Sequence, residues 1–99
     1  MSRRTDRING LVRQEISQLL SRQIRDPRLS GVISITQVKT AADLRSATVF
    51  VSVFGDAATK HSALQGIQSA TAFLRRELGS TLTLRYVPFL KFVLDDTIE

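Results

Sequence analysis

The sequence predicts a small α+β domain with one hydrophobic core and the element order helix, strand, strand, helix, strand. Apolar residues recur at three- and four-residue intervals in residues 5–26 and 59–78, which is the spacing of amphipathic helices. Residues 32–39, 46–54 and 82–94 are rich in β-branched and aromatic side chains and predict strands. A chain of 99 residues fits a single domain with one such core.

The first helix is expected to begin with Thr5 as its N-cap residue and to stop at Asp26. Pro27 has no N–H donor and biases the residue before it towards extended backbone, so Asp26-Pro27 is a helix stop. The apolar side chains of this helix share one face and should join the core: Ile8, Leu11, Val12, Ile16, Leu19, Leu20 and Ile24.

Positive charge is concentrated in this helix and its exit. The chain has a net charge of +5, and residues 1–28 carry seven arginines against three acidic residues. The face opposite the apolar one holds Arg7, Gln14, Gln18, Arg22 and Arg25, joined by Arg3 and Arg4 if the helix begins early. Such asymmetry is typical of a surface for nucleic acid or an anionic membrane, and the alternative is a solvated face that only aids solubility. The apolar stripe lacks aromatic anchors and a sheet follows, which favours a core helix over a membrane helix.

The next two strands should pair as an antiparallel hairpin, because only the short polar segment 40–45 joins them. Gly55-Asp56 ends the second strand. In the last strand, Pro88 predicts an edge position or a bulge, since proline cannot donate to a sheet.

The second helix has a weak middle and a defined end. Gly66 and the small or β-branched residues 69–72 lower helix propensity. Two interpretations remain open, tight packing of this helix on its own sheet and a kink or contact point for a partner. Gly79 is expected to be the left-handed residue that caps the helix at its C-terminal end.

The glycines and aromatic residues of the sequence do not predict recognition of RNA by base stacking. No pair of glycines has the Gly-x-x-Gly spacing of K-homology domains, and the phenylalanines are expected in the core: Phe50, Phe54, Phe73, Phe89 and Phe92. Recognition of folded RNA through shape and phosphate is therefore favoured over base stacking.

Catalytic, metal and redox chemistry find little support. His61 is the one histidine and is expected in solvent, and the acidic cluster of Asp95, Asp96 and Glu99 is interpreted as a solvated terminus. The sequence has no cysteine, no apolar run of membrane-spanning length and no secretion signal, so we expect a cytoplasmic protein without cofactor or metal.

Five segments, in this order, carry a resemblance to a known family. They are Ile24-Arg25-Asp26-Pro27-Arg28-Leu29, Ile35-Thr36-x-Val38, Asp43-Leu44-Arg45 with the following strand to Ser52, Phe73-Leu74-Arg75-Arg76-Glu77-Leu78, and residues 84–95. Together they resemble ribosome-binding factor A over about residues 7–96.

The resemblance implies a type II KH-like domain, with helix, two strands, two helices separated by a kink, and a last strand. Residues 1–99 would form this single RNA-binding domain, with an ordered core of about residues 5–96. The family kink would fall on Ala70-Thr71-Ala72, where alanine replaces the family glycine. A bend is still expected, because Ser69 and Thr71 can hydrogen-bond to the preceding turn.

The function implied is that of a non-catalytic bacterial assembly factor. It would bind the immature small (30S) ribosomal subunit, assist late maturation and processing of 16S rRNA, matter most in the cold, and leave before translation. The implied partners are this subunit and its rRNA, with assembly GTPases as further candidates, no membrane, and a monomeric chain.

The predicted rRNA-contacting side chains are arginines, although Arg45 lies in a loop, where arginine also serves solubility. They are Arg3, Arg4, Arg7, Arg22, Arg25, Arg28, Arg45, Arg75 and Arg76. Two alternatives stay open: another KH-like RNA-binding or ribosomal protein, and a protein-interaction module whose basic face meets an acidic partner. An enzyme is a more distant alternative.

Overall fold

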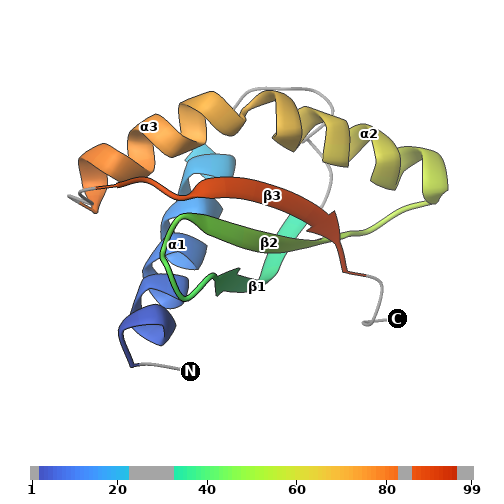
Figure 1. Ribbon diagram of the computed structural model, residues 1–99. Coiled ribbons are helices and arrows are strands. Elements are labelled where there is room, and N and C mark those ends of the chain that lie inside the picture. The colour runs from blue at the N-terminus through green and yellow to red at the C-terminus, as the bar shows by residue number, and fades with distance from the viewer. Residues whose placement is uncertain (1–2, 23–32, 83–85, 96–99) are drawn as a thin grey trace.

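The computed structural model describes residues 3–22, 33–82 and 86–95 of the chain. These residues form three helices and three strands, in the predicted order with the second helix divided in two (Figure 1). The predicted α+β class is confirmed. The elements are α1 Arg3–Arg22, β1 Ile33–Thr40, β2 Ser46–Val53, α2 Ala57–Ser69, α3 Thr71–Thr81 and β3 Phe89–Leu94.

The strands form one mixed sheet in the order β1-β2-β3. β1 and β2 are antiparallel, which confirms the hairpin, whereas β2 and β3 are parallel. A parallel neighbour needs a crossover connection, and α2 and α3 provide it. β3 is thus an edge strand, as Pro88 predicts, and Phe89 pairs with Ser46 at the start of β2.

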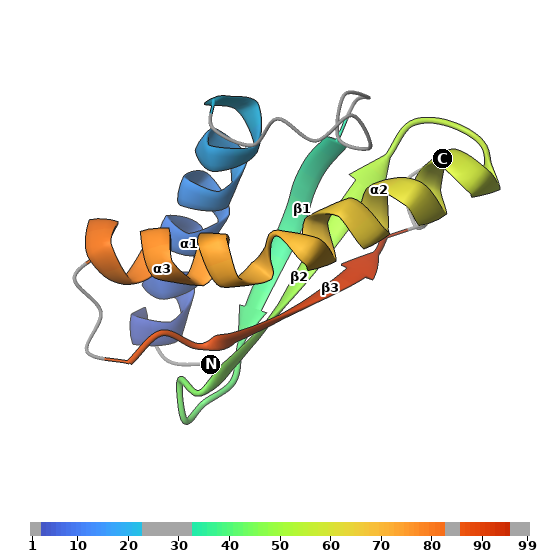
Figure 2. The ribbon, with the colours of Figure 1, turned by 90° about the horizontal axis from the view of Figure 1, so that it is seen from above.

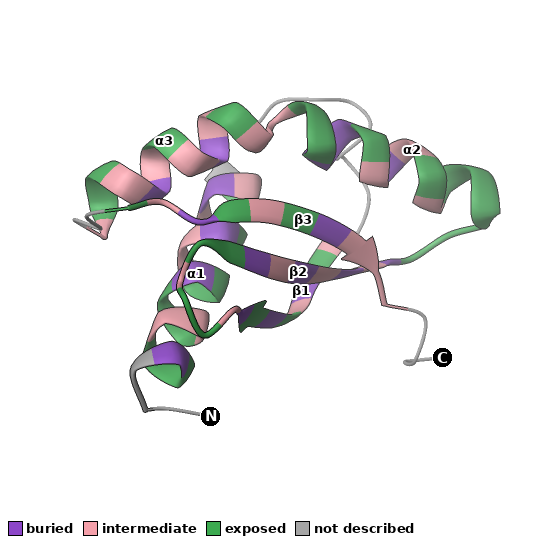
Figure 3. Ribbon diagram, in the orientation of Figure 1, coloured by how far each residue is buried: buried purple, intermediate pink, exposed green. Residues whose placement is uncertain are grey.

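The three helices cover one face of this sheet (Figures 1 and 2). Along β2 the residues alternate between buried and more exposed, so one face of the strand points into the core (Figure 3). The least exposed side chains come from every layer: Val12, Ile16, Val49, Val51, Ile67, Leu74 and Leu78.

The inner face of α1 largely matches the predicted stripe, with two differences. Leu11 lies at its margin and is 38% exposed, so its predicted core position is wrong. Thr5 was expected to cap the helix, but α1 already begins at Arg3 and Thr5 is buried within its first turns. The reason is spacing, because Thr5 precedes Ile8 by three residues and so belongs to the buried stripe. The predicted stop at Asp26-Pro27 lies outside the described residues.

α1 is fixed to the edge of β1 by two polar side chains. Asn9 Oδ1 accepts a hydrogen bond from the Thr40 N–H at 2.8 Å, and Arg13 Nε donates to the Ile35 carbonyl oxygen at 3.1 Å. Both contacts satisfy backbone groups of an edge strand, which would otherwise be a template for pairing with another chain. The sequence gives no sign of this role for Arg13, which is exposed on a helix.

The pairing of β1 and β2 is interrupted by a register shift between Ile35 and Gln37. The Thr36 hydroxyl at this irregularity lies 2.8 Å from Asp95 Oδ2 and 3.3 Å from the Phe50 carbonyl oxygen. A hydroxyl has one proton, and the shorter, charge-assisted bond to Asp95 is the stronger of the two. Asp95 is therefore tied to the sheet, and its predicted place in a solvated terminus is wrong.

The second helical segment breaks at Ala70, which has φ −90° and ψ 4°. The Ser69 hydroxyl donates to the Gln65 carbonyl oxygen at 2.9 Å, and the Thr71 hydroxyl donates to that of Gln68 at 2.7 Å. Both bonds run back to the preceding turn, as expected for a helix bent by Ser and Thr. The predicted bend is confirmed without a glycine at this position.

Gly79 does not end the helix, so its predicted capping role is wrong. α3 continues to Thr81, and Leu82 caps it with φ −91°. A Cβ atom built on Gly79 would lie 2.8 Å from Val87 Cγ2. The glycine is therefore needed for the close approach of residue 87 to α3. The last strand also starts later than predicted, at Phe89 and not at residue 82.

Candidate RNA-binding surface

The structure describes the surroundings of some of the arginines predicted to contact rRNA, and others lie outside the described residues. Arg3, Arg4 and Arg22 belong to α1, whereas Arg25 and Arg28 lie outside the described residues. The side chains whose surroundings are described are those of Arg7, Arg45, Arg75 and Arg76.

Arg7 is exposed on the N-terminal part of α1. It lies two residues from Asn9, or about 200° around the helix, so it points away from the edge of β1 that Asn9 binds. Arg76 is exposed on α3, and its Cζ lies 5.9 Å from the centre of the Phe73 ring. Within the described part of the chain, neither side chain has a contact that would prevent it from reaching a phosphate group.

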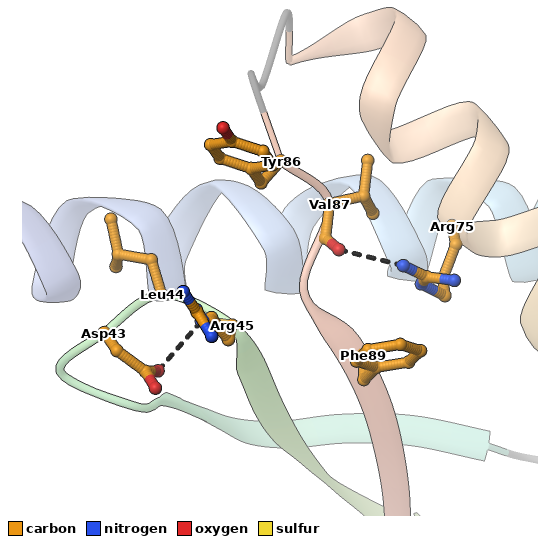
Figure 4. Close-up of a pocket in the computed structure, with 7 residues that line it drawn as sticks. All are labelled: Asp43, Leu44, Arg45, Arg75, Tyr86, Val87 and Phe89. Carbon is orange, nitrogen blue, oxygen red and sulfur yellow. Dashed lines mark hydrogen bonds between the residues drawn. The ribbon is translucent and has the colours of Figure 1, made fainter.

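Arg45 and Arg75 come together at one end of the molecule. The β1–β2 loop lies beside the beginning of β3 there (Figures 1 and 2), and Arg75 reaches the segment before β3 from the middle of α3. The Phe89 N–H donates to the Arg45 carbonyl oxygen at 2.9 Å, which fixes β3 to the loop. Between these elements lies a hollow of about 730 Å³, called here the loop hollow (Figure 4). Its lining residues are Asp43, Leu44, Arg45, Arg75, Tyr86, Val87 and Phe89.

Arg75 also has a structural role that the sequence does not reveal. Its Nη2 donates to the Val87 carbonyl oxygen at 2.9 Å and its Nε to the Pro88 carbonyl oxygen at 3.1 Å. Its Cζ lies 4.5 Å from the centre of the Phe89 ring, which is a cation–π distance. Arg75 thus fastens the segment before β3 to α3, and a substitution there would affect stability as well as any binding.

The loop that frames the hollow has an unusual backbone. Leu44 adopts φ +63°, a region that β-carbon-bearing residues rarely occupy. The Leu44 N–H donates to the Ala41 carbonyl oxygen at 2.9 Å, and Asp43 Oδ1 accepts from the Arg45 N–H at 3.0 Å. These bonds hold the loop closed, so the positions of Leu44 and Arg45 at the hollow are fixed.

The aromatic residues differ most from the positions predicted for them. Phe54 and Phe89 were predicted in the core, but they are 82% and 68% exposed, and Tyr86 is 73% exposed. Phe92 alone among the phenylalanines is buried, while Phe50 and Phe73 are half-buried. Two signals were available: Phe54 directly precedes the turn at Gly55, and Phe89 directly follows Pro88. Both positions lie at strand ends, where a side chain has few neighbours.

Other candidate sites add nothing to this surface. His61 is exposed on α2. Among residues 3–22, 33–82 and 86–95, no group of three or more His, Cys, Asp or Glu side chains is placed to hold a metal ion. Within the same ranges, no helix is both long enough and apolar enough to cross a bilayer.

Comparison with known proteins agrees with this fold. The sequence model of ribosome-binding factor A matches residues 4–99. The chain belongs to this family. Ribosome-binding factor A of Dictyoglomus thermophilum is 46% identical over 99 residues, covering 100% of this chain and 82% of that protein. The protein of the same name from Acetivibrio thermocellus is 46% identical over 96 residues, covering 97% and 78%.

Solved structures of the family share the fold. The crystal structure of ribosome-binding factor A from Thermus thermophilus superposes with a TM-score of 0.81 at 20% identity, covering 91% of this chain and 93% of that one. A homology model of ribosome-binding factor A from Thermus thermophilus, fitted into a cryo-electron microscopy map of a 30S–RbfA complex, superposes with a TM-score of 0.75 at 20% identity, with the same coverage. The type II KH-like architecture expected from the resemblance agrees with these likenesses.

Proposed function

We propose that this chain binds the immature small (30S) ribosomal subunit and assists the late maturation and processing of 16S rRNA, without catalysing a reaction itself. Membership of the ribosome-binding factor A family over residues 4–99 is the observation that carries the proposal. The presence of a relative in a 30S–RbfA complex supports the choice of partner.

The proposed binding is electrostatic. Exposed arginines on α1, α3 and the β1–β2 loop would neutralise rRNA phosphates and release their counterions. Arg7, Arg45 and Arg76 are the described side chains best placed for this, and Arg75 shares the loop hollow with Arg45. Arg3, Arg4, Arg22, Arg25 and Arg28 remain predicted contacts.

A dependence on cold follows from the same proposal. Incorrect RNA pairings last longer as the temperature falls, so a protein that favours the mature arrangement of an rRNA helix matters most then. We expect the factor to act as a monomer in the cytoplasm, with assembly GTPases as further partners and no membrane.

The experiment is sedimentation of the tagged protein in cell extract, with precursor and mature 16S rRNA probed in each gradient fraction. The proposal predicts enrichment with small subunits that contain precursor rRNA. Equal occupancy of mature subunits would identify a resident ribosomal protein instead. Complexes that survive ribonuclease treatment would identify a protein-interaction module.

A further inference from the structure

We propose that the loop hollow receives one unstacked base of single-stranded RNA, with the base against Phe89 and Tyr86 and the adjoining phosphate at Arg45. The proposal rests on the proposed RNA-binding function and adds a site and a mode of recognition to it. It also replaces the expectation that this chain reads RNA through shape and phosphate alone.

The aromatic rings at the hollow are largely exposed. Phe89 is 68% exposed and Tyr86 is 73% exposed, and both line the hollow, Tyr86 on the side of Leu44 and Phe89 next to Arg75 (Figure 4). Large rings in this state favour a flat partner that removes their apolar faces from water. Aromatic side chains beside positive charge are the usual platform for bases of single-stranded RNA.

The ring of Phe89 is held in place before any ligand arrives. The Arg75 guanidinium lies over it at 4.5 Å and is itself fixed by hydrogen bonds to the Val87 and Pro88 carbonyl oxygens. A ligand that stacks at Phe89 therefore meets an ordered ring, which lowers the entropic cost of binding. Arginine and aromatic side chains both stack on bases, so the pair of Arg75 and Phe89 is suited to a planar ligand such as a base.

The charge of the hollow favours an anionic group next to the base. Arg45 and Arg75 line it against one acidic residue, Asp43. Asp43 Oδ1 is engaged with the Arg45 N–H, which keeps the carboxylate at the loop backbone. A nucleotide supplies both parts that the hollow would accept, a flat base and a phosphate.

The size and openness of the hollow favour a single strand over a duplex. Its volume of about 730 Å³ lies in the range of pockets that hold small ligands, ~300–1,000 Å³. A base inside a duplex is stacked and paired and would have to leave the helix to enter. A base in a loop, bulge or strand end is already free to do so.

The test is a binding titration of the purified chain with a single-stranded RNA of about six nucleotides, the order of a stacking site. One base is 2-aminopurine, whose fluorescence reports stacking, and a duplex of the same sequence is the comparison. Phe89→Leu and Tyr86→Leu keep apolar bulk but remove the π face, and Arg45→Gln removes the charge. Phe54→Leu is the matched control, because Phe54 is 82% exposed in the β2–α2 connection at the opposite end of the molecule (Figure 2).

The proposal predicts that the single strand binds more tightly than the duplex and that its 2-aminopurine is quenched. Phe89→Leu and Tyr86→Leu should each weaken single-strand binding by about fivefold to a hundredfold, as loss of stacking on one base does. Arg45→Gln should weaken it without restoring the fluorescence, and Phe54→Leu should change neither quantity. Melting curves establish that each variant is folded.

Several results would overturn the proposal. These are duplex binding as tight as single-strand binding, unchanged quenching in both aromatic variants, and an equal loss in Phe54→Leu. Binding of an acidic peptide at this site in place of RNA would also overturn it. The proposed function is tested separately, because wild-type chain that still sediments with precursor subunits would leave that function intact while the hollow proposal fails.

Discussion

The guanidinium of Arg75 lies 4.5 Å from the centre of the Phe89 ring and joins α3, the second helix of the crossover, to the beginning of the last strand. The same side chain donates hydrogen bonds to the Val87 and Pro88 carbonyl oxygens. An arginine predicted from its charge to contact RNA is therefore also part of the framework that shapes the loop hollow. Separating these two roles is the main task for mutagenesis.

Arg75→Gln should destabilise the fold, while Arg76→Gln should not. Arg75→Gln removes two hydrogen bonds from a charged donor, which predicts a loss of about 1–3 kcal/mol in the free energy of unfolding. Arg76 is exposed and its replacement should change stability by less than about 0.5 kcal/mol. Urea denaturation of both variants measures the difference. Equal stabilities would show that the hydrogen bonds of Arg75 contribute little to folding. If the stabilities differ as expected, Arg76→Gln is the cleaner probe of RNA binding.

Gly79 and Val87 should behave as a coupled pair. Gly79→Ala gains helix propensity, about 1 kcal/mol, but its Cβ would lie 2.8 Å from Val87 Cγ2. The single substitution should therefore destabilise the protein by about 1–3 kcal/mol. In a Val87→Ala background the clash is relieved, and the same substitution should be neutral or stabilising. A double-mutant cycle from denaturation curves gives the coupling, and additive effects would contradict the close approach.

Asp56 should make the stability of α2 depend on pH. Its carboxylate caps the helix by accepting from the Thr59 N–H at 2.8 Å, and this hydrogen bond lowers the pKa of Asp56 below its ordinary value of 3.8. A group with a lowered folded-state pKa stabilises the protein fully above the unfolded pKa, and this contribution is lost as the pH falls through the folded pKa. The loss should therefore begin near pH 3.8 and continue below it.

Asp56→Asn separates this effect from the cap itself. Asparagine is an equally good N-cap residue but does not titrate, so the variant should lack this part of the acid destabilisation. Thermal melts of both proteins between neutral and acidic pH give the comparison. Parallel pH profiles for the two would show that the charge of Asp56 does not matter to folding.

Thr40→Val should stabilise the protein. Thr40 is 8% exposed, and within the described part of the chain its hydroxyl has no hydrogen-bond partner. Replacing a buried, unsatisfied hydroxyl by a methyl group of similar shape should raise the free energy of unfolding by about 1 kcal/mol. Thr48→Val, at a half-buried position of the neighbouring strand, is the control and should have a smaller effect. A loss of stability in Thr40→Val would indicate that the hydroxyl has a partner after all.

The order of the elements could be predicted because it depends on local patterns. The helical stripe of α1, the hairpin and the bend at Ala70 follow from spacing, turn residues and the hydroxyl groups of Ser69 and Thr71. Each of these signals lies within a few residues of the feature that it predicts. They were therefore visible in the sequence alone.

The features that could not be predicted depend on contacts between distant segments. Gly79 is a residue type typical of helix caps, but its role depends on the close approach of Val87, which comes from the segment before β3. Phe89 is a residue type typical of a core, but it lies at the end of an edge strand, where few side chains cover it. Arg13 and Arg75 resemble surface arginines, yet both donate to backbone carbonyl oxygens of other elements. Only the tertiary structure shows that these two arginines also have a structural role.

The measurement that tests the central claim most directly compares the affinity of the purified chain for immature and mature small subunits at several salt concentrations. The claim predicts tighter binding to immature subunits. It also predicts that the logarithm of the binding constant falls linearly with the logarithm of the salt concentration, with a slope proportional to the number of phosphates neutralised. Arg76→Gln should reduce this slope while leaving the fold intact. Equal affinity for both subunits, or binding that does not depend on salt, would contradict the account.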